Sequence, residues 1–158
     1  MAPPGRDGVQ WPAMPSPETV AVFRAAVETI VPATEKLPVG TDLGVHDHVT
    51  ALIDQGLPGF VDMIAALLDA YAAEVRPGAG FVDLMHDERN AVLRAMSSDE
   101  SQDIRDAVDA IIVFSLGGMF SEWTGYDRPT RDVKAPKAWS VVGFHGPVLG
   151  HPDYREDA

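Results

Sequence analysis

Histidine and acidic residues adjoin at two places where a catalytic or metal-binding site would be sought. They are His46-Asp47-His48 and His86-Asp87-Glu88. If the first motif lies on a helix, residues two apart point about 200° from each other, so its two histidines cannot bind one ion. Only an extended backbone would allow chelation. We expect a solvated first helical turn at the first motif, and acidic complements of a helix dipole at the second.

Two glycine-containing segments match ligand-binding loops only in part. Gly78-Ala79-Gly80 begins like a dinucleotide loop, but Asp83 replaces the third glycine and no strand is expected before it, so a plain turn is predicted. Ser115-Leu116-Gly117-Gly118 lacks the G-x-S-x-G frame of a nucleophile elbow. Its two glycines favour either a close helix–helix approach or a frayed helix end.

His145 lies in an apolar segment, from Trp139 to Pro147, whose two glycines and one proline fix an unusual backbone path. Two interpretations stay open. Either the segment packs on the domain and His145 makes a hydrogen bond, or it is a recognition surface where aromatic side chains provide most of the binding energy. The residues expected to anchor the end of the chain on the domain or on a partner are Trp123, Tyr126, Trp139, Gly143, Phe144, His145, Gly146 and Pro147.

Apolar residues recur at three- and four-residue spacing along most of the chain, which predicts an all-α fold, a small bundle of four or five helices. Ser16 and Pro17 start the first helix and Pro32 ends it. The last helix is expected to be capped by Ser97 or Ser98 together with Asp99, and its apolar stretch 110–120 is typical of a central buried helix. The expected helices cover residues 17–31, 45–55, 60–75, 86–96 and about 99–120.

The chain divides by composition into three parts. Residues 1–15 are an extended, proline-rich leader, residues 16–120 are the helical domain, and residues 121–158 are rich in aromatic residues, glycine and proline. A structureless stretch of this length needs a reason, either function or disorder. Because its aromatic content argues against disorder, we expect residues 121–158 to form an irregular C-terminal wrap packed on the domain or on a partner.

Composition excludes several classes of function. The 158 residues predict one domain, and the lack of cysteine excludes disulfides, thiolate zinc sites, iron–sulfur clusters and c-type haem. The formal charge of −12 disfavours nucleic-acid and anionic membrane partners. No apolar run of about 18 residues predicts a membrane span. Without a secretory signal or an Arg-Arg pair in the sequence, we expect a cytoplasmic protein.

The motif Trp139-x-x-Val142-Gly143-Phe144-x-Gly146 resembles the W-x-x-I-G-F-P-G signature of the gluconate 2-dehydrogenase subunit 3 family. The resemblance covers about residues 18–150. His145 stands where a proline is common, and Tyr126 is followed by Asp127-Arg128-Pro129 in place of Gly-Gly-Asn, so the chain is similar to a divergent member. Further similar segments are ETIVP ending at Pro32, Phe60-Val61-Asp62, Phe81-Val82-Asp83-Leu84 and Phe120-Ser121-Glu122.

The resemblance implies a non-catalytic small subunit that holds and matures a large flavin-dependent oxidoreductase of the glucose–methanol–choline type. Such a complex acts on a sugar, a sugar acid or a related alcohol, and its FAD and catalytic residues are expected in the large subunit. We expect no activity, cofactor or metal in this chain. The alternative is a self-contained helical ligand-binding protein or small enzyme that uses His145 with an acidic residue.

Overall fold

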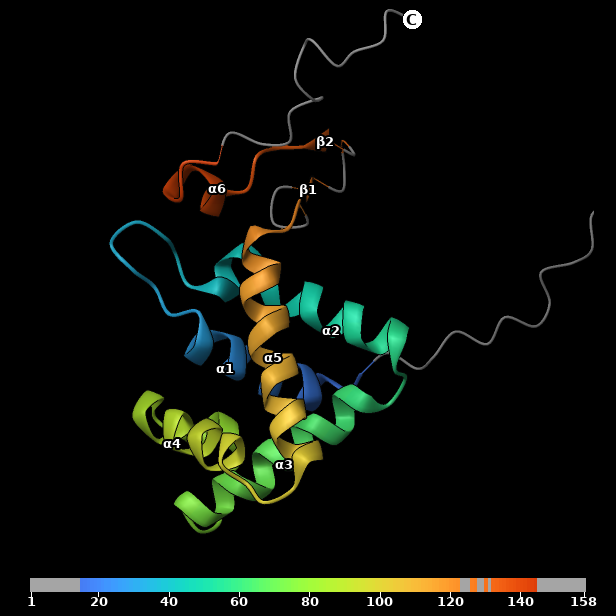
Figure 1. The fold of residues 1–158 in the computed structure, drawn as a ribbon, viewed down its shortest axis with the longest axis vertical. Coiled ribbons are helices and arrows are strands. Elements are labelled where there is room, and N and C mark those ends of the chain that lie inside the picture. The colour runs from blue at the N-terminus through green and yellow to red at the C-terminus, as the bar shows by residue number, and fades with distance from the viewer. Residues whose placement is uncertain (1–14, 123–125, 128–129, 131, 145–158) are drawn as a thin grey trace, which may run out of the picture.

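The computed structural model of the chain describes residues 15–122, 126–127, 130 and 132–144. Five long helices form the body of this part of the chain, which confirms the predicted all-α fold (Figure 1). Two short 3₁₀ turns, η1 (Gly40–Leu43) and η2 (Phe81–Asp83), precede the second and the fourth of them. The long helices are α1 (Pro17–Ile30), α2 (Val45–Gly56), α3 (Phe60–Val75), α4 (His86–Ser97) and α5 (Gln102–Phe120).

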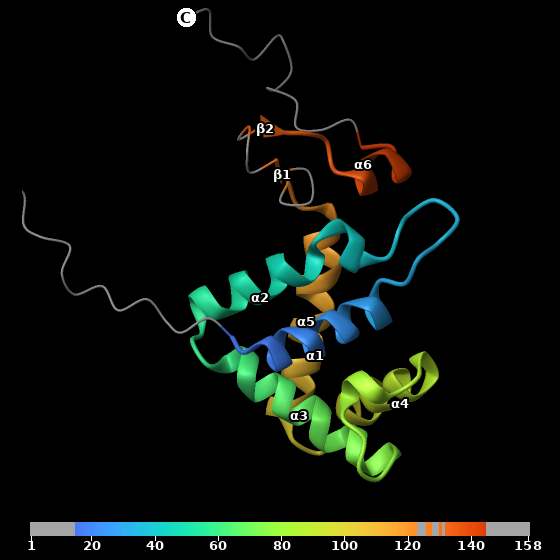
Figure 2. The ribbon, with the colours of Figure 1, turned by 180° about the vertical axis from the view of Figure 1, so that it is seen from behind.

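Helix α1 lies at the centre of the bundle, because it packs against all four other long helices. Figure 2 shows it crossing α5 between α2 and α3. Fully burying a large apolar side chain stabilises a fold by about 1.5–3 kcal/mol. The buried side chains around α1 therefore contribute most of the free energy that holds the helices together. The largest side chains with no exposed surface are Phe23, Val27, Ile64, Leu68, Phe81, Met96 and Ile111.

The start of α1 is fixed by a polar cap that also joins it to α3. Ser16 Oγ accepts a hydrogen bond from the Thr19 backbone N–H at 3.1 Å, as the sequence predicts for an N-cap serine. Thr19 Oγ1 in turn donates to Asp62 Oδ1 at 2.7 Å. The first turn of α1 is therefore held to the first turn of α3.

The predicted start of α5 at about residue 99 is wrong by three residues. Asp99 lies in the loop before the helix, where its carboxylate accepts hydrogen bonds from the Tyr71 hydroxyl and from the Ser101 backbone N–H. These bonds hold the backbone in a turn, so the helix begins only at Gln102, with Ser101 as its N-cap residue.

Gly118 allows α5 to lie close to α2. A Cβ at this position would lie 3.1 Å from Val45 Cγ1 and 3.1 Å from His48 Cδ2, whereas nothing lies within 4 Å of one at Gly117. Of the two roles that the sequence leaves open for the glycine pair, the structure therefore shows the close helix–helix approach, and at Gly118 alone.

One side of α5 is exposed, which corrects the expectation of a central helix buried on all sides. Val113 is 63% exposed, Leu116 44% and Phe120 38%. The buried residues of α5 lie on the opposite side, which packs against α1, α2 and α4. Among the described residues no further helix covers the outer side, so the apolar residues there are exposed.

A small substructure lies beyond the C-terminal end of α5 (Figure 1). It contains the strands β1 (Tyr126–Asp127) and β2 (Asp132–Val133), which pair antiparallel, and the short helix α6 (Lys137–Val141). Where the structure describes the segment expected to be irregular, regular elements are thus present. No described helix is long and apolar enough to span a membrane.

Candidate functional site

Residues 136–144, which we call the Trp139 turn, contain α6 and the reversal of the chain at its end. Gly143 has a left-handed backbone, with φ of 72°, which disfavours any residue with a side chain. The Phe144 N–H donates to the Trp139 carbonyl at 2.8 Å, and the Gly143 N–H donates to the Ser140 carbonyl at 3.4 Å. This pair of bonds defines a Schellman motif at the helix end.

The Schellman motif brings two aromatic side chains together. Trp139 and Phe144 meet edge to face, with ring centroids 4.9 Å apart and an interplanar angle of 80°. An apolar contact between these two positions commonly accompanies the motif. The sequence pattern W-x-x-x-G-F is therefore explained locally: its tryptophan and phenylalanine form this contact, and its glycine makes the turn that allows it.

The Trp139 turn is bonded to the end of α5. Trp139 Nε1 donates a hydrogen bond to the Phe120 carbonyl at 2.6 Å, which satisfies one of the carbonyls left free at a helix C-terminus. Pro136 and Ala138 are buried beneath the turn. Phe144 nevertheless remains 48% exposed, so the turn presents an aromatic surface to solvent.

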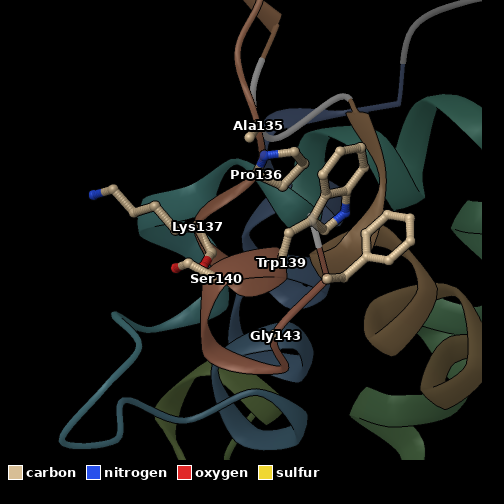
Figure 3. Close-up of a pocket in the computed structure, with 7 residues that line it drawn as sticks. Ala135, Pro136, Lys137, Trp139, Ser140 and Gly143 are labelled. Carbon is tan, nitrogen blue, oxygen red and sulfur yellow. The ribbon is translucent and has the colours of Figure 1, made fainter. Parts of the chain in front are cut away.

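An open hollow of about 480 Å³ adjoins the aromatic pair (Figure 3). Lys137 and Ser140 contribute the polar side chains of its lining, and Figure 3 shows the Lys137 side chain pointing away from Trp139. Ser140 and Lys137 are not paired as a nucleophile and a base, because the Ser140 hydroxyl donates to the Lys137 backbone carbonyl at 2.8 Å and the Lys137 side chain points away. Its chemistry suits contact with another apolar surface better than catalysis. The lining residues are Ala135, Pro136, Lys137, Trp139, Ser140, Gly143 and Phe144.

The structure brings together three of the eight anchor residues predicted from sequence, namely Trp139, Gly143 and Phe144. The backbone of Tyr126 lies in β1, where it pairs with Val133. The other four predicted anchors, Trp123, His145, Gly146 and Pro147, lie outside the described residues.

The first histidine motif lies at the start of α2, as predicted. The Asp47 side chain is exposed, but that of His46 is only 13% exposed, so the expected solvated turn is solvated on one side only. Burial lowers the pKa of His48 below its usual value. Among the residues that the structure describes, no three histidine or acidic side chains are placed to hold a metal ion.

The Gly78–Gly80 loop does not fit the pyrophosphate of a dinucleotide. The backbone N–H groups that would hold a phosphate already donate to carboxylates: Gly80 to Asp83 Oδ2 at 3.0 Å and Phe81 to Asp69 Oδ1 at 2.8 Å. A Cβ on Gly80 would lie 3.2 Å from the same Asp69 oxygen. An anion placed here would be repelled, so the loop is the turn that the sequence predicts.

Residues 80–89, which we call the Phe81 turn, have a buried ring at their centre, although Val82 and Met85 beside it are exposed. Phe81 is fully buried, and Arg89 donates to the Phe81 carbonyl at 3.2 Å and to the Val82 carbonyl at 2.8 Å. The Arg89 guanidinium also lies 5.8 Å from the Phe81 ring centroid, within range of a cation–π interaction. This turn therefore stabilises the fold.

Sequence reasoning did not single out the exposed side of α5. Its signal is nevertheless present: Asp106 and Asp109, which are exposed, precede Val113, Leu116 and Phe120 at helical spacing. An acidic stripe that continues into an apolar one marks a solvent-facing side of a helix.

The described residues thus define a small all-α protein with an exposed aromatic turn at one end. The chain matches the family model described as gluconate 2-dehydrogenase subunit 3 over residues 17–146, and it belongs to this family. It is accordingly an accessory subunit of a dehydrogenase complex. No curated protein and no solved structure matches the chain significantly.

Proposed function

We propose that the chain binds and stabilises a large flavin-dependent subunit of the glucose–methanol–choline type, in a complex that oxidises a sugar, a sugar acid or a related alcohol. The chain itself is non-catalytic in this proposal. The observation that carries it is the exposed Trp139–Phe144 pair. Aromatic side chains are enriched among the residues that dominate the binding energy of protein interfaces.

One loop of this chain supports the proposed division of labour, in which FAD lies in the partner. The Gly78–Gly80 segment, which begins like a dinucleotide loop, directs its N–H groups at the chain's own carboxylates. The lining of the hollow at the Trp139 turn offers apolar and aromatic groups, which favour contact with a partner. Membership of a subunit family supplies independent support.

Co-expression tests the proposal directly. The chain is tagged and produced together with a candidate flavoprotein subunit of the glucose–methanol–choline type, and the purified complex is measured by visible flavin absorbance and by turnover. We expect the flavoprotein to co-purify with the chain in stoichiometric amount. Trp139→Ala is expected to weaken binding by about 2 kcal/mol or more, roughly thirtyfold, because it removes an interface aromatic residue.

Two further variants make the test specific. Gly143→Ala keeps both rings but strains a left-handed turn, so it is expected to reduce assembly through their placement. Leu57→Ala removes an exposed apolar side chain between α2 and α3 and is expected to leave assembly unchanged. The KM of the assembled enzyme should stay constant throughout. Normal assembly with lost turnover would place the turn in an active site, and failure of the wild-type chain to bind the flavoprotein would refute the proposal.

A further inference from the structure

The outer side of α5 carries five side chains in one line. Asp106, Asp109, Val113, Leu116 and Phe120 recur at three- and four-residue spacing, which places them on one side of the helix. All five are exposed. We call them the α5 outer face: its N-terminal end is acidic and its C-terminal end is apolar.

The α5 outer face is continuous with the Trp139 turn. The two meet at Phe120, whose exposed side chain ends the line and whose carbonyl accepts the Trp139 indole N–H at 2.6 Å. Figure 1 shows α6 beyond the C-terminal end of α5. The C-terminal end of the α5 outer face therefore adjoins the Trp139 turn, and a partner bound at the turn is next to the apolar end of the helix.

We infer that the α5 outer face is the second half of the interface with the dehydrogenase subunit, and that this partner covers it with an apolar strip flanked by basic side chains opposite Asp106 and Asp109. The inference rests on the proposed function. It adds where the interface runs and which charge the partner brings to its acidic end. Interfaces of this kind combine an apolar centre with a polar, charged border.

Charge decides between the candidate occupants of this face. A second copy would carry the same charge of −12 and the same two aspartates, so like charges would oppose its docking. Residues 145–158 of the chain contain three acidic side chains and one arginine, and residues 1–14 contain one of each sign. A basic partner surface complements the face, and these alternatives do not.

A pair of matched substitutions tests the apolar half. Leu116→Glu places a charge on the face. Met63→Glu is the control: it makes the same kind of change on α3, which packs against α1, α2 and α4. The two side chains are similarly exposed, Met63 at 47% and Leu116 at 44%. Both variants should keep the thermal midpoint of the wild-type chain. We expect Leu116→Glu to weaken binding of the flavoprotein subunit at least tenfold and Met63→Glu to change it less than twofold.

A second pair tests the acidic half. Asp109→Lys is expected to weaken binding severalfold at low salt and to reduce its dependence on salt, because it removes an attraction between opposite charges. Glu74→Lys makes an equivalent charge change on α3 and should leave both quantities unchanged. Binding is measured by titrating the purified chain into the flavoprotein subunit at low and at high salt.

The outcomes separate this inference from the proposed function. If Trp139→Ala weakens the complex and Leu116→Glu does not, the interface ends at the Trp139 turn and the inference is wrong while the proposed function stands. If the chain alone forms a dimer that Leu116→Glu dissociates, a second copy occupies the face. If the face is protected from hydrogen exchange in the monomer and deletion of residues 145–158 exposes it, the chain's own end occupies it. Either of the last two results overturns the inference.

Discussion

The Phe81 turn and the Trp139 turn are built alike and used differently. Each places a phenylalanine directly after a glycine in a short, hydrogen-bonded reversal of the chain, yet Phe81 is fully buried and Phe144 is half exposed. At the first turn, an arginine and two carboxylates bind the backbone groups around the ring. At the second turn, the rings contact each other and leave one surface open.

The difference teaches that a family motif does not by itself indicate whether it serves folding or binding. Both segments resemble family patterns, and composition gives no reason to separate them. Burial and the identity of the hydrogen-bond partners separate them: internal partners on every side indicate a structural role, and an ordered but uncovered aromatic pair indicates a binding role.

The largest expected effect is at the buried turn. Phe81→Ala should lower the free energy of unfolding by about 3–5 kcal/mol, because it leaves a cavity between α1, α3 and α4 and removes the ring beneath Arg89. Urea denaturation of the isolated chain measures this. A loss below about 1 kcal/mol would mean that the two turns do not differ in the way their burial indicates.

A smaller effect is expected at the bond between Tyr71 and Asp99, which supports the same end of the molecule. The hydrogen bond to Asp99, followed by desolvation, raises the pKa of Tyr71 from 10.0 to about 12. The same bond and then the Ser101 N–H lower the pKa of Asp99; desolvation opposes them in part, and the charge of Arg105 adds a smaller lowering effect.

The signs of these shifts predict a window of stability. Tyr71 contributes stability that is present below pH 10 and is lost as the pH rises through about 12. Asp99 contributes stability that is present above its ordinary pKa of 3.8 and is lost as the pH falls through its lowered value. Denaturation midpoints of Tyr71→Phe should therefore change less than those of the wild-type chain at both extremes. Parallel pH curves for the two proteins would contradict the prediction.

The smallest effect on stability is expected at the exposed turn. Phe144→Ala should change the free energy of unfolding of the isolated chain by less than about 1 kcal/mol, because the ring is half exposed and its aromatic contact is with Trp139 of the same turn. The same variant should reduce the yield of the complex with the flavoprotein subunit. A loss of stability as large as that of Phe81→Ala would show that the turn holds the bundle together, and the contrast between the two regions would disappear.

The sequence predicts the helices well and the surface poorly, for physical reasons. Apolar spacing defines α1 to α5, and Pro32 and Gly56 mark where helices end. The exposed side of α5 is missed because spacing shows which residues share a side, whereas exposure depends on how many helices are available to cover it. The start of α5 is missed because the Asp99 hydrogen bond comes from Tyr71, 28 residues earlier in the chain.

The Trp139 turn could have been predicted more fully than it was. A tryptophan four residues before a glycine, with a phenylalanine directly after it, is the pattern of a Schellman motif with its apolar contact. The helix within it has only five residues, too few to show periodicity. The bond from its indole to Phe120 depends on tertiary packing, so no local pattern indicates it.

That indole bond gives the molecule its own optical probe. Tryptophan emission depends on the exposure of the ring and on the partner of its N–H, and Trp139 is partly exposed, bonded to the end of α5 and in contact with Phe144. The other two tryptophans are Trp11 and Trp123, so replacing both with phenylalanine leaves a chain with a single fluorophore. Arrival of a partner at the Trp139 turn would then be followed in real time, without a label, by the emission wavelength of this one residue.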